Sequence, residues 1–277
     1  MASQGSVGVI DPKNYTFLQK HIYSHAGIVL EGDKHYLFES RLAPIVRQLG
    51  LESIDDLCVF IQSSRQPEVS HRVVEAMTTN ETYFFRDPSH YDAIRTVLLP
   101  RLIEERRDTR KLRFWSAASS TGQEAYSLAM VLIEAGLSDW NIQILGTDFS
   151  SQVVERARSG KYRQIEVNRG LPATLLIKYF TRSGTDWNLS DKVRRMVSFE
   201  TIDLRGSMRA LGPFDLVFCR NVMIYFDATT KMNILKELQG TLFHGGWLFL
   251  GGAETALGVT EFFERTTVGN ATVYVAR

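Results

Sequence analysis

The chain has 277 residues, of which 44% are hydrophobic and 23% are charged, with a formal net charge of +1. This length allows one large domain or two ordinary ones, and the composition is that of a globular protein. The near-neutral charge argues against nucleic acid as a partner and against binding to an anionic membrane. Two cysteines, Cys58 and Cys219, are too few for a disulfide scaffold or a thiolate zinc site, and no metal site is expected.

The first residues, MASQGSVGVIDPK, lack the basic and apolar regions of a signal peptide. No stretch has the apolar length of a membrane span. We therefore expect a cytoplasmic protein that does not insert into membranes.

The N-terminal part, residues 1–77, shows a helical pattern. Apolar residues recur there at intervals of three and four, and Ser53 precedes an acidic first turn as a helix N-cap does. These features predict a small all-helical domain. Residues 78–110 then form a predicted linker segment that contains TTNETYFFRD, where Arg86 follows three aromatic residues. Such a stretch is either strained core or one wall of a pocket for a charged group.

From residue 111 to 277, strand-like runs alternate with helical runs, which predicts a doubly wound α/β domain with a mostly parallel sheet. Strands are expected at 112–118, 141–148, 214–221 and 246–252, and helices at 123–136, 150–160 and 229–242. Two final β-rich pieces flank the turn Gly269–Asn270, which predicts an antiparallel last strand. The stretch at about 160–203 interrupts this alternation and predicts a small inserted lobe.

Ligands of open α/β sheets bind at the carboxyl ends of the strands. The first predicted strand is followed by SAASSTGQEAYS, whose small residues allow close approach to the backbone, although the dinucleotide fingerprint is absent. Glu124 in this turn suits a cationic ligand, the alternative being a simple response to the helix dipole. Asp148 ends the second strand, where a ribose diol is often bound, and Asp203 ends another, where an adenine could be met. Acids and amides at these ends fit S-adenosylmethionine.

The chain resembles the bacterial chemotaxis receptor methyltransferases, the CheR family of protein-glutamate O-methyltransferases. The resemblance covers about residues 76–277 and rests on TTNETYFFRD, WSAASSTGQEAYSLAM, GTDFSSQVVERA, SGKY, RGLP and FDLVFCRNVMIYFD. It implies a Rossmann-like methyltransferase fold with a β-rich lobe and an N-terminal helical domain. It also implies methyl transfer from S-adenosylmethionine to chemoreceptor glutamates in chemotactic adaptation, with S-adenosylhomocysteine as the product.

The resemblance implies a role for each matching residue. Arg86 would hold the incoming carboxylate, and Tyr225 would lie beside the transferred methyl group. The cofactor contacts it implies come from Asn80, Thr82, Arg86, Glu124, Asp148, Asp203, Leu204, Asn221 and Val222. One departure is the turn Gly252–Ala253–Glu254, where many members have Gly-His-Ser-Glu. The short turn RSGTDWN in the lobe argues against a lobe that grips a receptor C-terminal peptide.

Several alternatives stay open at this stage. The cations Lys34, Arg41 and Arg47 on one predicted helix are candidates for docking the acidic receptor helices, against the default of a solvated face. Arg86 could instead pair with a neighbouring acid. The protein could bind S-adenosylmethionine as a scaffold without transfer, or methylate a small molecule. Adenine methylation in nucleic acid is disfavoured because no prolines follow Asn221. A further regulatory partner is open, and a monomer is expected.

Overall fold

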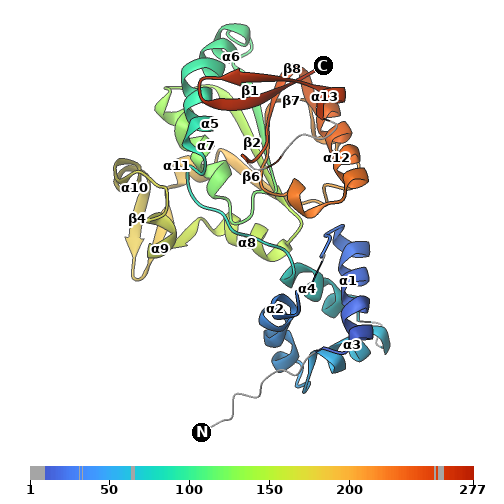
Figure 1. Cartoon of the computed structure of the whole chain (residues 1–277). Coiled ribbons are helices and arrows are strands. Elements are labelled where there is room, and N and C mark those ends of the chain that lie inside the picture. The colour runs from blue at the N-terminus through green and yellow to red at the C-terminus, as the bar shows by residue number, and fades with distance from the viewer. Residues whose placement is uncertain (1–9, 31, 33, 64–65, 253, 255–258) are drawn as a thin grey trace. The chain divides into compact units, whose positions relative to one another are not determined.

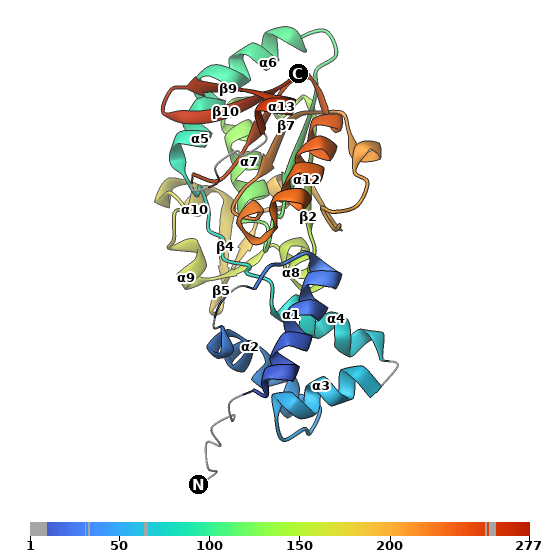
Figure 2. The same ribbon diagram turned by 45° about the vertical axis from the view of Figure 1, so that its right-hand side comes forward.

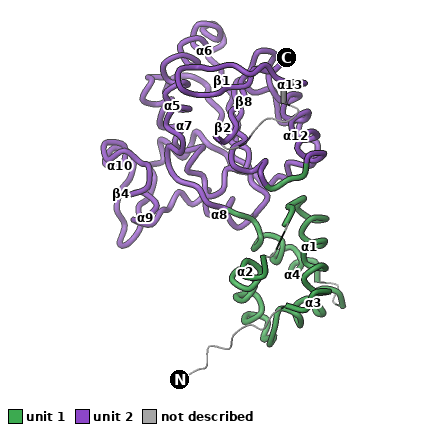
Figure 3. The backbone as a smooth tube through the Cα atoms, in the orientation of Figure 1, with its two compact units in different colours: residues 1–79, 225–227 green, residues 80–224, 228–277 purple. Residues whose placement is uncertain are grey.

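The computed structural model describes residues 10–30, 32, 34–63, 66–252, 254 and 259–277. Two compact units make up the chain: one runs to Thr79 and also takes in Tyr225–Asp227, and the other comprises Asn80–Ile224 and Ala228–Arg277 (Figure 3). The predicted boundaries at residues 77 and 110 stay a prediction, but the segment after Asn80 lies in the second unit. Within the described residues, no helix combines the length and apolarity that crossing a membrane requires.

The first unit contains four described helices, α1 (Pro12–Ala26), α2 (His35–Gln48), α3 (Ile54–Ser63) and α4 (Pro67–Ala76). Their starts follow from the local sequence: the Asp11 side chain accepts from the Lys13 amide before α1, and Ser53 Oγ accepts from the Asp56 amide before α3. The predicted N-cap at Ser53 is thus confirmed. Each helix turns its apolar stripe inward, and Leu18, Ile22, Phe38, Leu42, Leu57 and Val73 have no exposed surface.

The second unit is built on a seven-stranded sheet in the order β6-β2-β1-β7-β8-β10-β9. Its strands are β1 (Lys111–Ala117), β2 (Asn141–Asp148), β6 (Val197–Thr201), β7 (Phe214–Cys219), β8 (Leu242–Phe249), β9 (Phe263–Val268) and β10 (Ala271–Ala276). The pairs from β6 to β8 are parallel, whereas β10 is antiparallel to both β8 and β9. This confirms the predicted parallel sheet and its antiparallel end.

Helices cover both faces of this sheet. The elements α5 (Pro88–Ala93), the π-helix η1 (Ile94–Leu98), α6 (Leu99–Glu105), α7 (Gln123–Glu134) and α8 (Ser151–Ser159) precede or follow β1 and β2. In Figure 1, α5, α6 and α7 lie on one side of the sheet, and α12 (Ala228–Gly240) and α13 (Val259–Phe262) on the other. Short turns of helix follow at α11 (Asp191–Arg194), η2 (Arg209–Leu211) and η3 (Met223–Tyr225), whose last residue is counted with the first unit. Every residue of β7 is buried, as expected for a central strand covered on both faces.

A small lobe is inserted between β2 and β6, and it appears in yellow in Figures 1 and 2. Its antiparallel sheet has the order β3-β5-β4, from β3 (Lys161–Arg163), β4 (Phe180–Ser183) and β5 (Asp186–Leu189). Along the chain, the helices α9 (Gln164–Val167) and α10 (Ala173–Tyr179) connect β3 to β4. The end of the stretch predicted as an insertion, near residue 200, joins the main sheet instead as β6, because it pairs with β2 in parallel.

Candidate active site

Glu124 lies in the first turn of α7 and is buried, although an isolated carboxylate there would lose its hydration. Its two oxygens accept from Ser116 Oγ at 2.7 Å and from Arg220 Nη1 at 2.8 Å. Burial raises the pKa of Glu124, while the Arg220 charge and the Ser116 hydroxyl lower it. Glu124 does lie in the first helical turn, where the helix dipole favours an acid, but the dipole alone does not account for its burial between Ser116 and Arg220.

Arg220, at the end of β7, is the centre of the buried charge cluster. Its Nη2 donates to the Arg86 carbonyl oxygen at 2.8 Å and also binds the Asp87 carboxylate. Burial by itself lowers the pKa of Arg220, but the Glu124 and Asp87 carboxylates outweigh this effect and raise the pKa above its ordinary value. The guanidinium therefore stays charged. One side chain thus joins the end of β7, the start of α7 and the linker segment.

The linker backbone around Arg86 is held in an uncommon conformation. Phe85 and Asp87, on either side, have φ values of 52° and 57°. Six non-glycine residues of the described chain have positive φ, and all except Arg110, at the end of the linker, lie next to Arg86 or in the turns after β1 and β7. Each such residue costs roughly 1–2 kcal/mol, so the surrounding contacts must hold the backbone there. This strain makes the carboxyl edge of the sheet the candidate for the functional site.

Arg86 itself makes a modest set of contacts. Its Nη1 donates to the Glu81 carbonyl oxygen at 3.2 Å, and its guanidinium lies 5.4 Å from the centre of the Tyr83 ring. The two acids considered as alternative partners are engaged elsewhere: the Glu81 carboxylate binds Arg169 at 2.7 Å, and Asp87 binds Arg220. Among the described residues, neither Glu81 nor Asp87 forms an ion pair with Arg86.

The lobe fixes the other side of the linker. Phe84 is fully buried and packs edge-on against Tyr162 and Phe180 of the lobe, with ring centres 5.0 and 5.6 Å away. The same ring belongs to the hydrophobic core that includes Phe114 of β1 and Phe218 of β7. At Gly170, a Cβ atom would lie 2.0 Å from the Phe84 carbonyl oxygen. This close approach explains why the RGLP motif has glycine there.

Asp148 ends β2 and is nearly buried. Its carboxylate accepts from the Ser120 amide at 2.8 Å and the Ser150 amide at 3.1 Å. Ser150 is the N-cap of α8, so Asp148 is not needed for capping. Asp148 thus lies at the carboxyl end of the sheet, where open α/β sheets bind their ligands.

The turn after β7 is held by Glu254. This carboxylate, 7% exposed, accepts from the backbone amides of Asn221 and Met223 at 2.8 Å each and from Gly251 at 2.6 Å. A Cβ at Gly251 would lie 2.7 Å from Asn221 Nδ2, so this glycine lets the two turns approach. Ala253, part of the turn where the sequence departs from the family pattern, lies outside the described residues.

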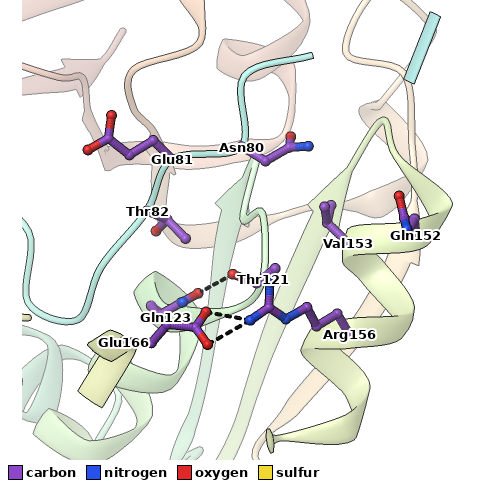
Figure 4. Close-up of a pocket in the computed structure, with 9 residues that line it drawn as sticks. All are labelled: Asn80, Glu81, Thr82, Thr121, Gln123, Gln152, Val153, Arg156 and Glu166. Carbon is purple, nitrogen blue, oxygen red and sulfur yellow. Dashed lines mark hydrogen bonds and ion pairs between the residues drawn. The ribbon is translucent and has the colours of Figure 1, made fainter. Parts of the chain in front are cut away.

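A pocket of about 520 Å³, lined mainly by polar side chains, lies between the linker, the start of α7, α8 and the lobe (Figure 4). Of the predicted site residues it is lined by Asn80 and Thr82, which face Thr121 and Gln123 across it. The Asn80 carbonyl oxygen accepts from Ser120 Oγ at 2.8 Å, which ties the linker to the turn after β1. The predicted cofactor-binding acids Glu124, Asp148 and Asp203 do not line this pocket.

Other predicted residues are placed as follows. Asp203 is held by Arg205, whose Nη2 lies 2.7 Å from its carboxylate, and Leu204 is 7% exposed. Val222 follows the strained Asn221. Tyr225 belongs to the first unit, where its carbonyl oxygen accepts from the Val29 amide, so the structure does not place it with the strand-end cluster.

The three docking candidates also lie in the first unit. Arg41 donates to the carbonyl oxygens of Met77 and Thr78 at 2.7 and 2.8 Å, which fixes the end of the helical domain. Arg47 is exposed in the last turn of α2, and Lys34 is the half-buried residue before that helix. Arg41 thus has a structural task that the sequence did not reveal.

The polar side chains at the strand ends suit S-adenosylmethionine. Buried Glu124 and Asp148 offer carboxylates to a cation and to a diol, and Ser119 Oγ is buried there without a hydrogen-bond partner among the described residues. The Ser120 amide in the turn after β1, which could otherwise donate to a phosphate, is taken by the Asp148 carboxylate. No group of three or more His, Cys, Asp or Glu in the described parts could hold a metal ion.

Three residues that organise the site were not assigned a role from the sequence: Arg220, Glu254 and Gly170. Arg220 was visible as a strand-end residue, but its partners Asp87 and Glu124 are 133 and 96 positions away in the chain. Nothing in a local pattern predicts such long-range pairs.

Comparison with known proteins agrees with this geometry. Residues 80–271 match the family described as CheR methyltransferase, SAM binding domain, and residues 13–78 match its all-alpha domain. Chemotaxis protein methyltransferase 1 of Pseudomonas aeruginosa is 39% identical over 257 residues, covering 91% of this chain and 93% of that protein. Chemotaxis protein methyltransferase Cher2 of Pseudomonas putida is 36% identical over 98% of this chain and 100% of its own length.

The chemotaxis protein methyltransferase of Escherichia coli is also similar, with 35% identity over 91% of this chain and 87% of that protein. The two family matches together span both units of the structure. The chain therefore belongs to the CheR family of S-adenosylmethionine-dependent methyltransferases.

Proposed function

We propose that this enzyme transfers the methyl group of S-adenosylmethionine to glutamate side chains on the methylation helices of chemoreceptors, in the cytoplasm. The observation that carries the proposal is the strained linker at Arg86, which Arg220 ties to the buried Glu124 carboxylate. This arrangement sets a cation that can bind a carboxylate beside acids that can bind a cationic cofactor. The names of the relatives, which are chemotaxis methyltransferases, support the same process.

The chemistry needs positioning more than acid–base catalysis. The bond between the methyl carbon and the sulfonium sulfur breaks as a bond from that carbon to a glutamate oxygen forms. The products are a methyl ester and S-adenosylhomocysteine, a neutral thioether. Glutamate has a usual pKa of about 4.3, so the acceptor is already ionised at neutral pH and needs no general base. The protein must then hold the two reactants in line.

We assign the residues accordingly. Glu124 binds the ammonium group of the cofactor, and Asp148 binds the ribose hydroxyls. Asn80 and Thr82 contact the cofactor from the linker, and Arg86 also reaches it while holding the acceptor carboxylate with two N–H groups. These roles use the same donor and acceptor types that the residues offer in the structure.

The remaining assignments concern the far strand ends. Leu204 supplies an apolar contact to the adenine, next to Asp203. Asn221 and Val222 line the methionine side, and Tyr225 lies beside the methyl group during transfer. The support for these roles is their position in family motifs, together with the strained backbone at Asn221.

Substrate docking is assigned to Lys34 and Arg47, with Arg41 contributing through its hold on the start of the linker. Acidic receptor helices would be attracted to these cations, mainly through faster association. We further propose that the enzyme acts as a monomer, binds no nucleic acid, and reaches the membrane only through its receptor. A regulatory protein partner remains compatible with this assignment.

The test is methyl transfer from isotope-labelled S-adenosylmethionine to a chemoreceptor cytoplasmic fragment, followed by mild alkali. Release of the label as methanol identifies a glutamyl methyl ester and supports the proposal. Label that resists alkali would mean another acceptor group. Cofactor binding without transfer to fragments from any receptor of the host would refute the assigned substrate.

A further inference from the structure

Arg220 is built into the site more deeply than any residue assigned to the cofactor or the acceptor. Its side chain is 2% exposed, and its guanidinium binds Glu124, the Arg86 carbonyl oxygen and Asp87. Phe218 lies below it, with the ring centre 5.6 Å from the guanidinium carbon. Arg220 therefore sits between the proposed cofactor end of the site and its proposed acceptor end.

The linker conformation depends on few contacts around Arg86. The residues before and after it, Phe85 and Asp87, both have positive φ. The Phe85 amide donates to Ser127 Oγ at 3.0 Å, and the Arg86 carbonyl oxygen accepts from Arg220 at 2.8 Å. A strained segment persists only where its surroundings hold it, and Arg220 provides two of these contacts, one to the backbone and one to Asp87.

We propose that Arg220 is a positioning residue for methyl transfer: it fixes the linker backbone at Arg86 and the Glu124 carboxylate relative to each other. This inference rests on the proposed roles of Arg86 and Glu124. Without the guanidinium, Glu124 would be buried with only the Ser116 hydroxyl as partner, and the linker would lose its contact at Arg86. Both ends of the site would then shift independently.

The geometry requires arginine rather than any cation. The three acceptor groups belong to two segments distant in the chain, and the two Nη atoms divide between them: Nη1 serves Glu124 on α7, and Nη2 serves Arg86 and Asp87 on the linker. A planar guanidinium presents such donors in fixed directions, whereas a lysine ammonium is a compact charge on a shorter reach. Lysine would keep the charge next to Glu124 but could not also hold the linker.

The experiment compares Arg220→Lys and Arg220→Gln with the wild type and with Arg107→Gln, a control at an exposed ion pair. Hydrogen exchange of the cofactor-free protein is followed in peptides covering residues 82–92 and, for comparison, in β10 and α7. We expect exchange in 82–92 to rise at least tenfold in both Arg220 variants, with β10 unchanged. The kcat should fall roughly 100-fold in Arg220→Lys, and the control should behave as wild type.

Unchanged exchange at 82–92 in Arg220→Lys would overturn the proposal. A uniform rise in all peptides would also overturn it, because it would show a general loss of stability rather than positioning. If Arg220→Gln does not fold, Arg220→Lys, which keeps the buried charge, carries the test. The exchange measurement needs no receptor, so it remains decisive even if methyl transfer to chemoreceptors is not observed.

Discussion

Replacing Gly170 by alanine should disable the enzyme from outside the cofactor site. Gly170 has a φ of 79°, and its Cβ would lie 2.0 Å from the Phe84 carbonyl oxygen and 3.1 Å from Tyr83 Cδ2. Real Cβ contacts essentially never fall below 3.0 Å, so the backbones at Gly170 and Phe84 must separate by at least the difference, 1.0 Å, and we expect the linker to take up much of this shift. A displacement of about 1 Å in a positioned catalytic group can cost about 100-fold in rate.

Gly184→Ala provides the matched control. Gly184 lies in the same lobe with a φ of 62°, but a Cβ there would have nothing within 4 Å. Both substitutions carry the backbone penalty of a left-handed alanine, roughly 1–2 kcal/mol of folding free energy. Only Gly170→Ala also pushes the linker.

The assay combines urea unfolding with steady-state methyl transfer. We expect Gly184→Ala to lose about 1 kcal/mol of stability and to keep its kcat/KM. Gly170→Ala should lose about 100-fold in kcat/KM while remaining folded at the assay temperature. Equal activity of the two variants would refute the reasoning that contact with the lobe sets the position of the linker.

Three further predictions concern single side chains. Arg86→Ala should keep the fold, because in the described structure the Arg86 guanidinium makes one hydrogen bond, to a backbone carbonyl. The variant should nevertheless lose roughly 100-fold in kcat/KM. Full turnover by the folded variant would contradict the role assigned to Arg86. Arg47→Glu should raise the KM for receptor roughly 3- to 10-fold at low salt, and exposed Lys20→Glu should not; equal effects would argue for general charge rather than docking. Burial, with the Arg220 charge nearby, lowers the pKa of His90 from the usual 6.5 to about 4. The unfolded chain therefore binds a proton between these values that the folded protein does not, so stability should fall by about 2 kcal/mol from about pH 7 to about pH 5, and His90→Asn should flatten this dependence in urea titrations.

The sequence predicted the parts of the fold that local patterns encode. Strand–helix alternation gave the parallel sheet, the turn at Gly269 gave its antiparallel end, and Ser53 marked a helix start. The same reasoning extended the inserted stretch too far toward its C-terminal end, because a strand run does not reveal which sheet it joins. Pairing with β2 decides that for Val197–Thr201.

Strand-end residues could be recognised as candidates because the fold brings carboxyl ends of parallel strands to one edge. Asp148 and Glu124 became candidates in this way. The contacts that hold the site could not be found, since Arg220, Glu254 and Gly170 act on backbone groups distant in the chain. Arg41 is the opposite case, because the sequence suggested a docking role that its contacts do not require. Its guanidinium donates to backbone carbonyls of its own domain.

The central claim is that the acids at the strand ends form the cofactor site, and calorimetric titration with S-adenosylhomocysteine tests it most directly. Wild type, Asp148→Asn and the lobe variant Asp186→Asn should first be shown to melt alike. We predict one binding site in the wild type and in Asp186→Asn, and at least roughly tenfold weaker binding in Asp148→Asn, because charged hydrogen bonds to the ribose are lost. Binding to Asp148→Asn with the wild-type dissociation constant would contradict the claim.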